Sequence, residues 1–229
     1  MRGALCILAL ATAMATAGPG TAQVPPTGAE IAVYRGLHAA AQRGDVEALG
    51  KLAASGAAID ARDAQGRTPL HVATFARQRE AIRALAKAGA SLDLLENDRY
   101  DALTIASVAD DPETLALLLS LGANAKQVTS RYDGTALIAV AHLGHDEVVR
   151  QLIRAGAPLD HVNNLHWTAV IESIVLGDGG PRHQRTLAAL IAAGASLQLA
   201  DRQGRTPLAL ARARGFAVMT QQLVAAGVR

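Results

Sequence analysis

The sequence has almost no cysteine and few aromatic residues, and each shortage excludes a class of protein. The single cysteine, Cys6, lies within the first ten positions, so the rest of the chain has no thiol for catalysis, disulfides or cysteine-based zinc sites. One Trp, three Tyr and two Phe are present, although half of the chain is hydrophobic. Alanine and aliphatic residues supply most of the rest, and small side chains favour thin layers of packed helices over one large core.

The chain also lacks a strong charge bias and the common catalytic motifs. Lys and Arg number 22 against 20 Asp and Glu, and removal of Arg2 would leave 21 against 20. The arginine clusters lack interleaved aromatics and long basic runs, which is typical of solvated faces rather than of nucleic-acid binding. Neither a Gly-rich phosphate loop nor a Gly-x-Ser-x-Gly turn is present. We therefore expect no nucleic-acid partner, no cofactor, no resident metal and no catalytic residue, and so not an enzyme.

The clearest local signal is the segment Gly66–His71, which reads Gly-Arg-Thr-Pro-Leu-His. Thr68 is suited to capping a helix, Pro69 to the first helical position, and the ring of His71 to bonding back to the turn. The segment Gly204–Ala209 repeats the motif almost letter for letter. Three further segments keep the cap and an aliphatic residue but lose the proline: Asp101–Leu103, Thr135–Leu137 and Thr168–Val170.

A Gly-Ala pair gives this repeat a period. The glycines are Gly56, Gly89, Gly122, Gly156 and Gly194, with a last glycine at Gly227, and the steps are 33, 33, 34, 38 and 33 residues. A period near 33 with this motif indicates a helical solenoid, and the chain resembles the ankyrin repeat family from about Ala32 to its C-terminus. The resemblance implies an all-α repeat fold, an ankyrin-type solenoid of about six helix-turn-helix units with β-hairpin fingers. We place the units near residues 32–62, 63–95, 96–129, 130–162, 163–200 and 201–229.

Aliphatic residues support the same register. The second helix of each unit is expected to bury residues at i, i+3 and i+4. The trios with this spacing are Leu49, Leu52, Ala53; Ile82, Leu85, Ala86; Leu115, Leu118, Leu119; Val149, Leu152, Ile153; and Leu187, Leu190, Ile191. In the last unit the trio begins with the polar Thr220, which fits an end that meets water. The unit near 163–200 has extra residues at Gly177–Arg182, which we expect to form a flexible surface bulge.

The N-terminus has the pattern of an export signal over residues 1–22. A single arginine precedes the apolar run Ala4–Leu10, and small residues follow, with cleavage expected after Ala17 or Ala22. The run is too short to cross a bilayer, which needs about 20 apolar residues, so no membrane span is expected after signal cleavage. Residues 23–31 are interpreted as a short flexible tail before the repeat domain, and the protein is expected to be periplasmic or secreted.

Most of the aromatic residues fall at positions that the resemblance marks as a binding surface. The residue just before each first-helix cap is Tyr34, Arg67, Tyr100, Gly134, Trp167 or Arg205. Tyr132 lies at a finger tip and Phe75 on an inner first-helix position, so five of the six aromatics take contact positions. The predicted partner-binding set is Tyr34, Gln42, Arg43, Arg67, Phe75, Tyr100, Tyr132, His142, Leu143 and Trp167. An alternative is that the same rings pack between neighbouring fingers and only stabilise the stack.

Two functional hypotheses follow. The favoured one is a monomeric, non-catalytic scaffold of the bacterial envelope or periplasm that holds a protein partner, such as an exported enzyme, on its concave face and finger tips. The alternative is a metal-binding or enzymatic protein that uses His142, His161, His166 and nearby carboxylates. His38 and His71 share one motif position, so we interpret these two rings as structural.

Overall fold

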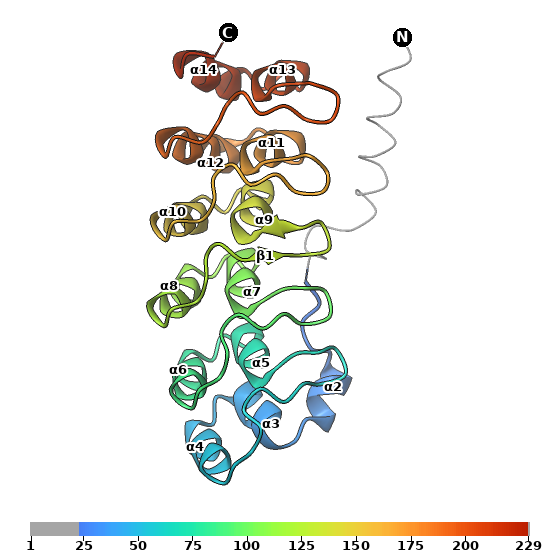
Figure 1. Cartoon of the computed structure of the whole chain (residues 1–229), viewed down its shortest axis with the longest axis vertical. Coiled ribbons are helices and arrows are strands. Elements are labelled where there is room, and N and C mark those ends of the chain that lie inside the picture. The colour runs from blue at the N-terminus through green and yellow to red at the C-terminus, as the bar shows by residue number, and fades with distance from the viewer. Residues whose placement is uncertain (1–22, 229) are drawn as a thin grey trace.

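The computed structural model describes residues 23–228 and shows helix pairs stacked one above another (Figure 1). A short helix, α2 (Gly28–Val33), precedes six pairs within the described residues. The first helices of the pairs form one row: α3 (Gly36–Arg43), α5 (Pro69–Phe75), α7 (Ala102–Val108), α9 (Ala136–Leu143), α11 (Ala169–Val175) and α13 (Pro207–Ala213). The second helices form a row beside it: α4 (Val46–Ala54), α6 (Arg79–Lys87), α8 (Pro112–Ser120), α10 (Asp146–Arg154), α12 (Pro181–Ala192) and α14 (Ala217–Ala225). The predicted solenoid of helix-turn-helix units is confirmed.

The first helices begin where the repeated motif predicts. The Thr68 side chain accepts a hydrogen bond from the backbone N–H of His71, and Pro69 takes the first helical position. The His71 Nδ1 atom accepts the backbone N–H of Thr68 at 3.0 Å, so its Nε2 donates to the Tyr100 carbonyl at 3.2 Å. Burial lowers the pKa of His71 from 6.5 to about 4, which keeps the ring neutral. This histidine therefore caps its own helix and ties its unit to the next one.

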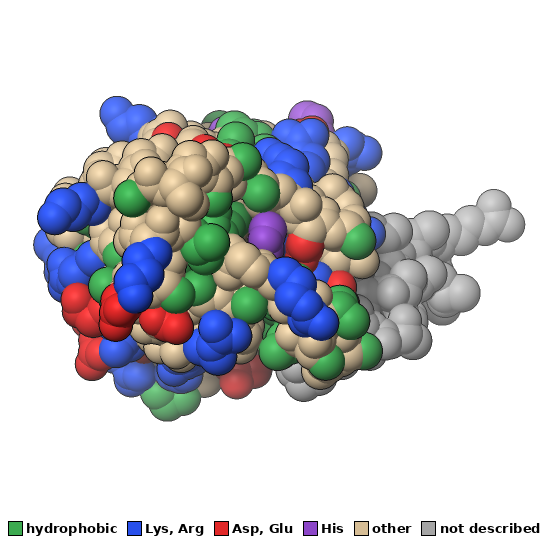
Figure 2. Space-filling model, turned by 90° about the horizontal axis from the view of Figure 1, so that it is seen from below, with side chains coloured by type: hydrophobic (Ala, Val, Ile, Leu, Met, Phe, Trp, Pro, Cys, Tyr) green, Lys and Arg blue, Asp and Glu red, His purple; other side chains and the backbone are tan. Residues whose placement is uncertain are grey.

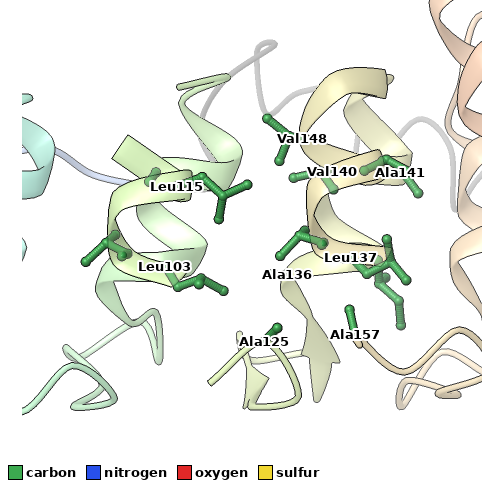
Figure 3. Close-up of a cluster of buried hydrophobic side chains, with 14 of the residues drawn as sticks. Leu103, Leu115, Ala125, Ala136, Leu137, Val140, Ala141, Val148 and Ala157 are labelled. Atoms are coloured by element: carbon green, nitrogen blue, oxygen red, sulfur yellow. The ribbon is translucent and has the colours of Figure 1, made fainter. Parts of the chain in front are cut away.

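The core lies between successive helix pairs and is built from aliphatic side chains. Figure 3 shows one such cluster, in which side chains of α7 and α8 face those of α9 and α10. Leu115 and Leu118 of the α8 trio are fully buried, whereas Leu119 is half-buried at the margin. The trios of α6, α10 and α12 follow the same order, whereas the second member in α4 and the first member in α14 are also only half-buried. Burial of one such leucine stabilises the folded state by about 1.5–3 kcal/mol, so the stability of the stack is the sum of many contributions of this size.

The recurring glycines close the second helices at equivalent corners. Gly89, Gly122, Gly156 and Gly194 have φ values of 90°, 100°, 79° and 86°, in the left-handed region that glycine adopts without a Cβ penalty. The chain then enters a finger, by which we mean the connection from a second helix to the next first helix. Only the finger between α8 and α9 contains a strand pair within residues 23–228: β1 (Val128–Thr129) runs antiparallel to β2 (Gly134–Thr135), with Val128 opposite Thr135.

The N-terminal segment, of which residues 23–31 were expected to be a short flexible tail, has hydrogen-bonded structure of its own. It ends in α2, which begins with a capping box: the Thr27 side chain accepts the Glu30 N–H, and the Glu30 carboxylate accepts the Thr27 N–H. The Gln23 side chain donates to the Thr104 carbonyl in α7 at 2.9 Å. The segment thus runs along the first-helix row beside α7 and α5 before it reaches α3 (Figure 1). The predicted export signal, residues 1–22, lies outside the described residues.

The extra residues at 177–182, expected to form a flexible surface bulge, lengthen α12 and are bonded to the next unit. Pro181 and Arg182 open α12, which has 12 residues where α10 has nine. Arg214 donates to the carbonyls of Val175 and Gly177 at 2.7 and 2.9 Å, and these bonds fix the short connection from the next unit. Across the described part of the chain, no helix is both long and apolar enough to cross a membrane.

Candidate protein-binding surface

Four of the residues just before the first helices share one structural role. Each closes the turn at its finger tip, because its carbonyl accepts the N–H of the residue four positions earlier. These bonds are 3.0 Å long for Arg67, Tyr100, Trp167 and Arg205. We call the surface formed by these turns and the first helices the finger face.

A polar side chain at the start of each turn locks it further, and sequence reasoning missed this residue. The Asp63 Oδ1 atom accepts two backbone N–H groups, those of Gln65 and Arg67, at 2.9 and 2.8 Å. The residues in the equivalent positions that accept the same pair of bonds are Glu96, Ser130, Asn163 and Asp201. The available signal was a short polar acceptor four residues before each predicted contact residue.

Arg67 is buried in an ion-pair network and is not free surface. Its side chain is 2% exposed, its Nε donates to Asp63 at 2.7 Å, and its Nη2 pairs with Glu30 at 2.5 Å. The Tyr34 hydroxyl donates to the same carboxylate atom as Arg67 Nε, Asp63 Oδ2, also at 2.7 Å. Hydrogen bonds from the backbone and hydroxyl of Thr27, with help from Arg67, hold the pKa of Glu30 below its usual 4.5. The carboxylate therefore stays charged and keeps the pair intact at neutral pH.

Arg205 occupies the same motif position as Arg67 but is not covered by the N-terminal segment. Its guanidinium pairs with Asp201 as Arg67 pairs with Asp63, and the two finger turns have the same hydrogen bonds. The Arg205 side chain is nevertheless 29% exposed, against 2% for Arg67. The burial of Arg67 therefore comes with residues 23–34 rather than with the repeat itself.

The predicted aromatic contacts divide by exposure. Tyr34 and Tyr100 are each only 9% exposed, and burial raises the pKa of Tyr100 to about 12. Trp167 is half-buried against the core, whereas Tyr132, at its finger tip, is 43% exposed. Tyr34 and Tyr100 thus pack within the stack, as the alternative hypothesis expects, whereas Tyr132 faces solvent.

The remaining predicted contacts lie at the other end of the first helices. Gln42, Arg43, Phe75, His142 and Leu143 occupy the last turns of α3, α5 and α9. A helix of eight residues is about 12 Å long, so these side chains are separated by that distance from the finger turns. Arg43 is 63% exposed and the other four are half-buried. The structure therefore brings the predicted set together as two strips rather than one patch.

The histidines of the alternative hypothesis lie in different local environments. His161 Nε2 lies 2.6 Å from the Asp133 carbonyl, and the His142 carbonyl is bonded by the ring of His183 at 2.8 Å. His166 is at a finger tip with a φ of 64°. Among residues 23–228, no group of three or more His, Cys, Asp and Glu side chains could hold a metal ion. His38 is also structural, with Nε2 2.9 Å from the Arg67 carbonyl.

The end of the stack at α4 has a mixed polar surface. Seen from that end, basic and acidic side chains lie next to one another with only scattered hydrophobic ones (Figure 2). Lys51 pairs with Glu47 at 2.5 Å and Arg43 lies 3.9 Å from Asp45. Such an outer face is what an end unit of a solenoid needs in water.

Comparison with known proteins supports the fold. The family profile described as Ankyrin repeats (3 copies) matches residues 37–129, and the profile described as Ankyrin repeat matches residues 132–164. YahD of Escherichia coli strain K12, described as an ankyrin repeat protein, is 34% identical over 189 residues, which are 82% of this chain and 94% of YahD.

Solved structures give the same result. An ankyrin repeat domain from Acinetobacter baumannii AYE is 41% identical with a TM-score of 0.79, over 84% of this chain and 98% of that one. The ankyrin repeat domain of Bcl-3, a member of the IkappaB family, is 25% identical with a TM-score of 0.76, over 86% of this chain and 88% of that one. Ankyrin repeats indicate a protein–protein interaction scaffold, and nothing in these matches indicates an enzyme. The chain belongs to the ankyrin repeat family.

Proposed function

We propose that this protein is a monomeric, non-catalytic scaffold of the periplasm or the secreted fraction that holds a protein partner on its finger face. The observation that carries the proposal is the exposure of Tyr132 at a finger tip, in a chain with only six aromatic residues. A large exposed ring covers much area at little entropic cost, which makes it suitable as a binding anchor. Half-buried Trp167, in the next finger, adds a second anchor.

The fingers are preorganised for binding, which supports the same function. Backbone bonds join successive finger tips: Asn97 to Gln65 at 3.0 Å and Asn164 to Tyr132 at 2.9 Å. A surface that is already ordered loses little conformational entropy when a partner binds. The carbonyl of Tyr132 is part of this ladder, so its ring is presented from a fixed backbone.

Export can be tested separately from binding. We expect the protein in the periplasmic or secreted fraction, with a mature N-terminus at Gly18 or Gln23, as the predicted cleavage sites require. Edman or mass-spectrometric sequencing of the protein from fractionated cells gives the answer. Full-length protein retained in the cytoplasm would refute the location without affecting the binding proposal.

Binding is tested by affinity capture from the fraction that contains the protein, followed by quantitative mass spectrometry. Tyr132→Ala and Trp167→Ala are expected to reduce the captured partner at least ~10-fold, the effect of losing about 1.4 kcal/mol or more at a hot spot. Val46→Ala is the matched control, because Val46 on α4 is as exposed as Tyr132, at 43%, but lies on the second-helix row. Equal loss of capture in all three variants would refute the finger face as the binding surface.

A further inference from the structure

The N-terminal segment Gln23–Val33 is attached to the finger face mainly by polar contacts. None of the residues of α2 is buried, and the hydrophobic side chains Val24, Ile31 and Val33 are 58%, 37% and 68% exposed. The segment therefore contributes little to the apolar core. An element with so little buried apolar area has a low free energy of local opening.

Its contacts have the form of an extended peptide bound to a protein surface. Pro25 and Pro26 favour an extended backbone, and this part of the segment contains no helix. The Gln23 amide donates to the Thr104 carbonyl, and Arg67 Nη1 donates to the Val24 carbonyl at 3.4 Å. Further along the segment, in the first turn of α2, the Glu30 carboxylate pairs with Arg67.

The charge of Arg67 explains why the segment carries a carboxylate. A guanidinium has five N–H donors, and Asp63 takes only the Nε donor of Arg67. The equivalent guanidinium of Arg205 is partly exposed to water, but Arg67 lies under the segment and its Nη2 bonds to Glu30 instead. We call Arg67, Asp63 and the Thr104 carbonyl the Arg67 surface.

We propose that the Arg67 surface binds a carboxylate-bearing segment of the partner protein that resembles residues 23–33, an extended stretch followed by a helical turn, and that residues 23–33 occupy this surface in its place when the partner is absent. The inference rests on the proposed scaffold function and names the chemistry of the partner. A tethered segment competes at an effective concentration in the millimolar range, so the partner segment must pair with Arg67 to displace it.

The test uses the full chain and a labelled synthetic peptide with the sequence of residues 23–34. The intact protein is expected to bind this peptide weakly, because its own segment holds the Arg67 surface. Glu30→Gln weakens that hold and is expected to increase peptide affinity at least ~10-fold, as loss of intramolecular competition requires. Glu47→Gln is the control, since Glu47 lies in the second-helix row and pairs with Lys51 of its own helix, α4.

Two further comparisons decide the chemistry. A peptide in which glutamine replaces the glutamate is expected to bind the Glu30→Gln variant no more tightly than it binds the intact protein. The Glu30→Gln, Arg67→Gln double variant is expected to show no increase in affinity for the original peptide. Hydrogen exchange of residues 23–33 provides a second readout: excess peptide is expected to accelerate exchange there in the intact protein. Circular dichroism confirms that each variant is folded.

Several outcomes would overturn the inference. The first is equal affinity of Glu30→Gln and the intact protein for the peptide. The second is an affinity that does not change when the peptide carboxylate is removed. The third is a concentration-dependent dimer of Glu30→Gln, which would assign the surface to a second copy. Each can occur while Tyr132 and Trp167 still determine partner capture, so failure here is distinguishable from failure of the scaffold proposal.

Discussion

Replacing Glu172 with glutamine is expected to stabilise the protein at neutral and alkaline pH. Glu172 lies in α11, is 6% exposed, and its carboxyl group accepts one hydrogen bond, from Asn163 Nδ2 at 2.8 Å. Burial raises the pKa of this carboxyl from 4.5 to about 8, and the bond from Asn163 offsets only part of that effect. The folded protein therefore keeps Glu172 protonated under conditions in which the unfolded chain would ionise it.

The sign of the pH dependence follows from the raised pKa. The protonated Glu172 carboxyl contributes its full stabilisation below pH 4.5. This stabilisation is lost as the pH rises towards 8, because the unfolded chain releases the proton at a lower pH than the folded protein does. Each pH unit in that window lowers the free energy of unfolding by about 1.4 kcal/mol, so at pH 7 the wild type is less stable by roughly 3 kcal/mol than it is below pH 4.5. Glutamine can keep the bond from Asn163 and has no proton to lose, so the variant avoids this loss.

Thermal unfolding measured between pH 5 and 9 tests the prediction. Trp167, the single tryptophan, lies in the same unit and provides a local fluorescence signal, with far-UV circular dichroism as the global one. For a chain of this size, about 3 kcal/mol corresponds to roughly 6–12 °C in Tm at pH 7. Glu80→Gln, at an exposed site on α6, is the control and should change little. Parallel pH profiles for wild type and Glu172→Gln would refute the reasoning.

The remaining predictions concern other buried or strained positions. Because the pKa of His71 is lowered to about 4, stability should fall as the pH drops from 6.5 towards 4, and His71→Gln should flatten that part of the acid-unfolding curve. Arg99 has a φ of 67° where Gly66 has 72°, so Arg99→Gly should raise the free energy of unfolding by about 1 kcal/mol in urea titration; a decrease would contradict the strain. Leu118→Ala should cost about 2–5 kcal/mol and Leu119→Ala clearly less, and equal losses would contradict the assigned packing.

Much of the fold could be predicted because local signals and the period agree. Thr68 and Pro69 specify a helix start by short-range hydrogen bonding and backbone geometry, and Gly122 specifies a helix end by its left-handed φ. Such signals act within a few residues of one another. Because the motif recurs at a fixed period, each repeat is expected to have the same structure and the same neighbours. The structure of one unit therefore predicts the whole stack.

The candidate site could be predicted only in part, because burial depends on contacts distant in the sequence. Arg67 and Arg205 lie in nearly identical motifs, yet one is buried by Glu30, 37 residues earlier, and the other remains partly exposed. Tyr100 and Tyr132 both took predicted contact positions, and only Tyr132 faces solvent. The path of residues 23–33 along the first helices has no periodic signal, so the sequence pattern could not place it.

The most direct test of the scaffold account is site-specific photo-crosslinking in cells that make the full-length protein. A photoreactive phenylalanine analogue is placed at Tyr132 on the finger face in one variant and at Val46 on the second-helix row in another; the two native side chains are equally exposed. The account predicts a discrete covalent adduct with one protein from position 132 and none from position 46. Adducts from position 46 alone, or none from position 132, would contradict it.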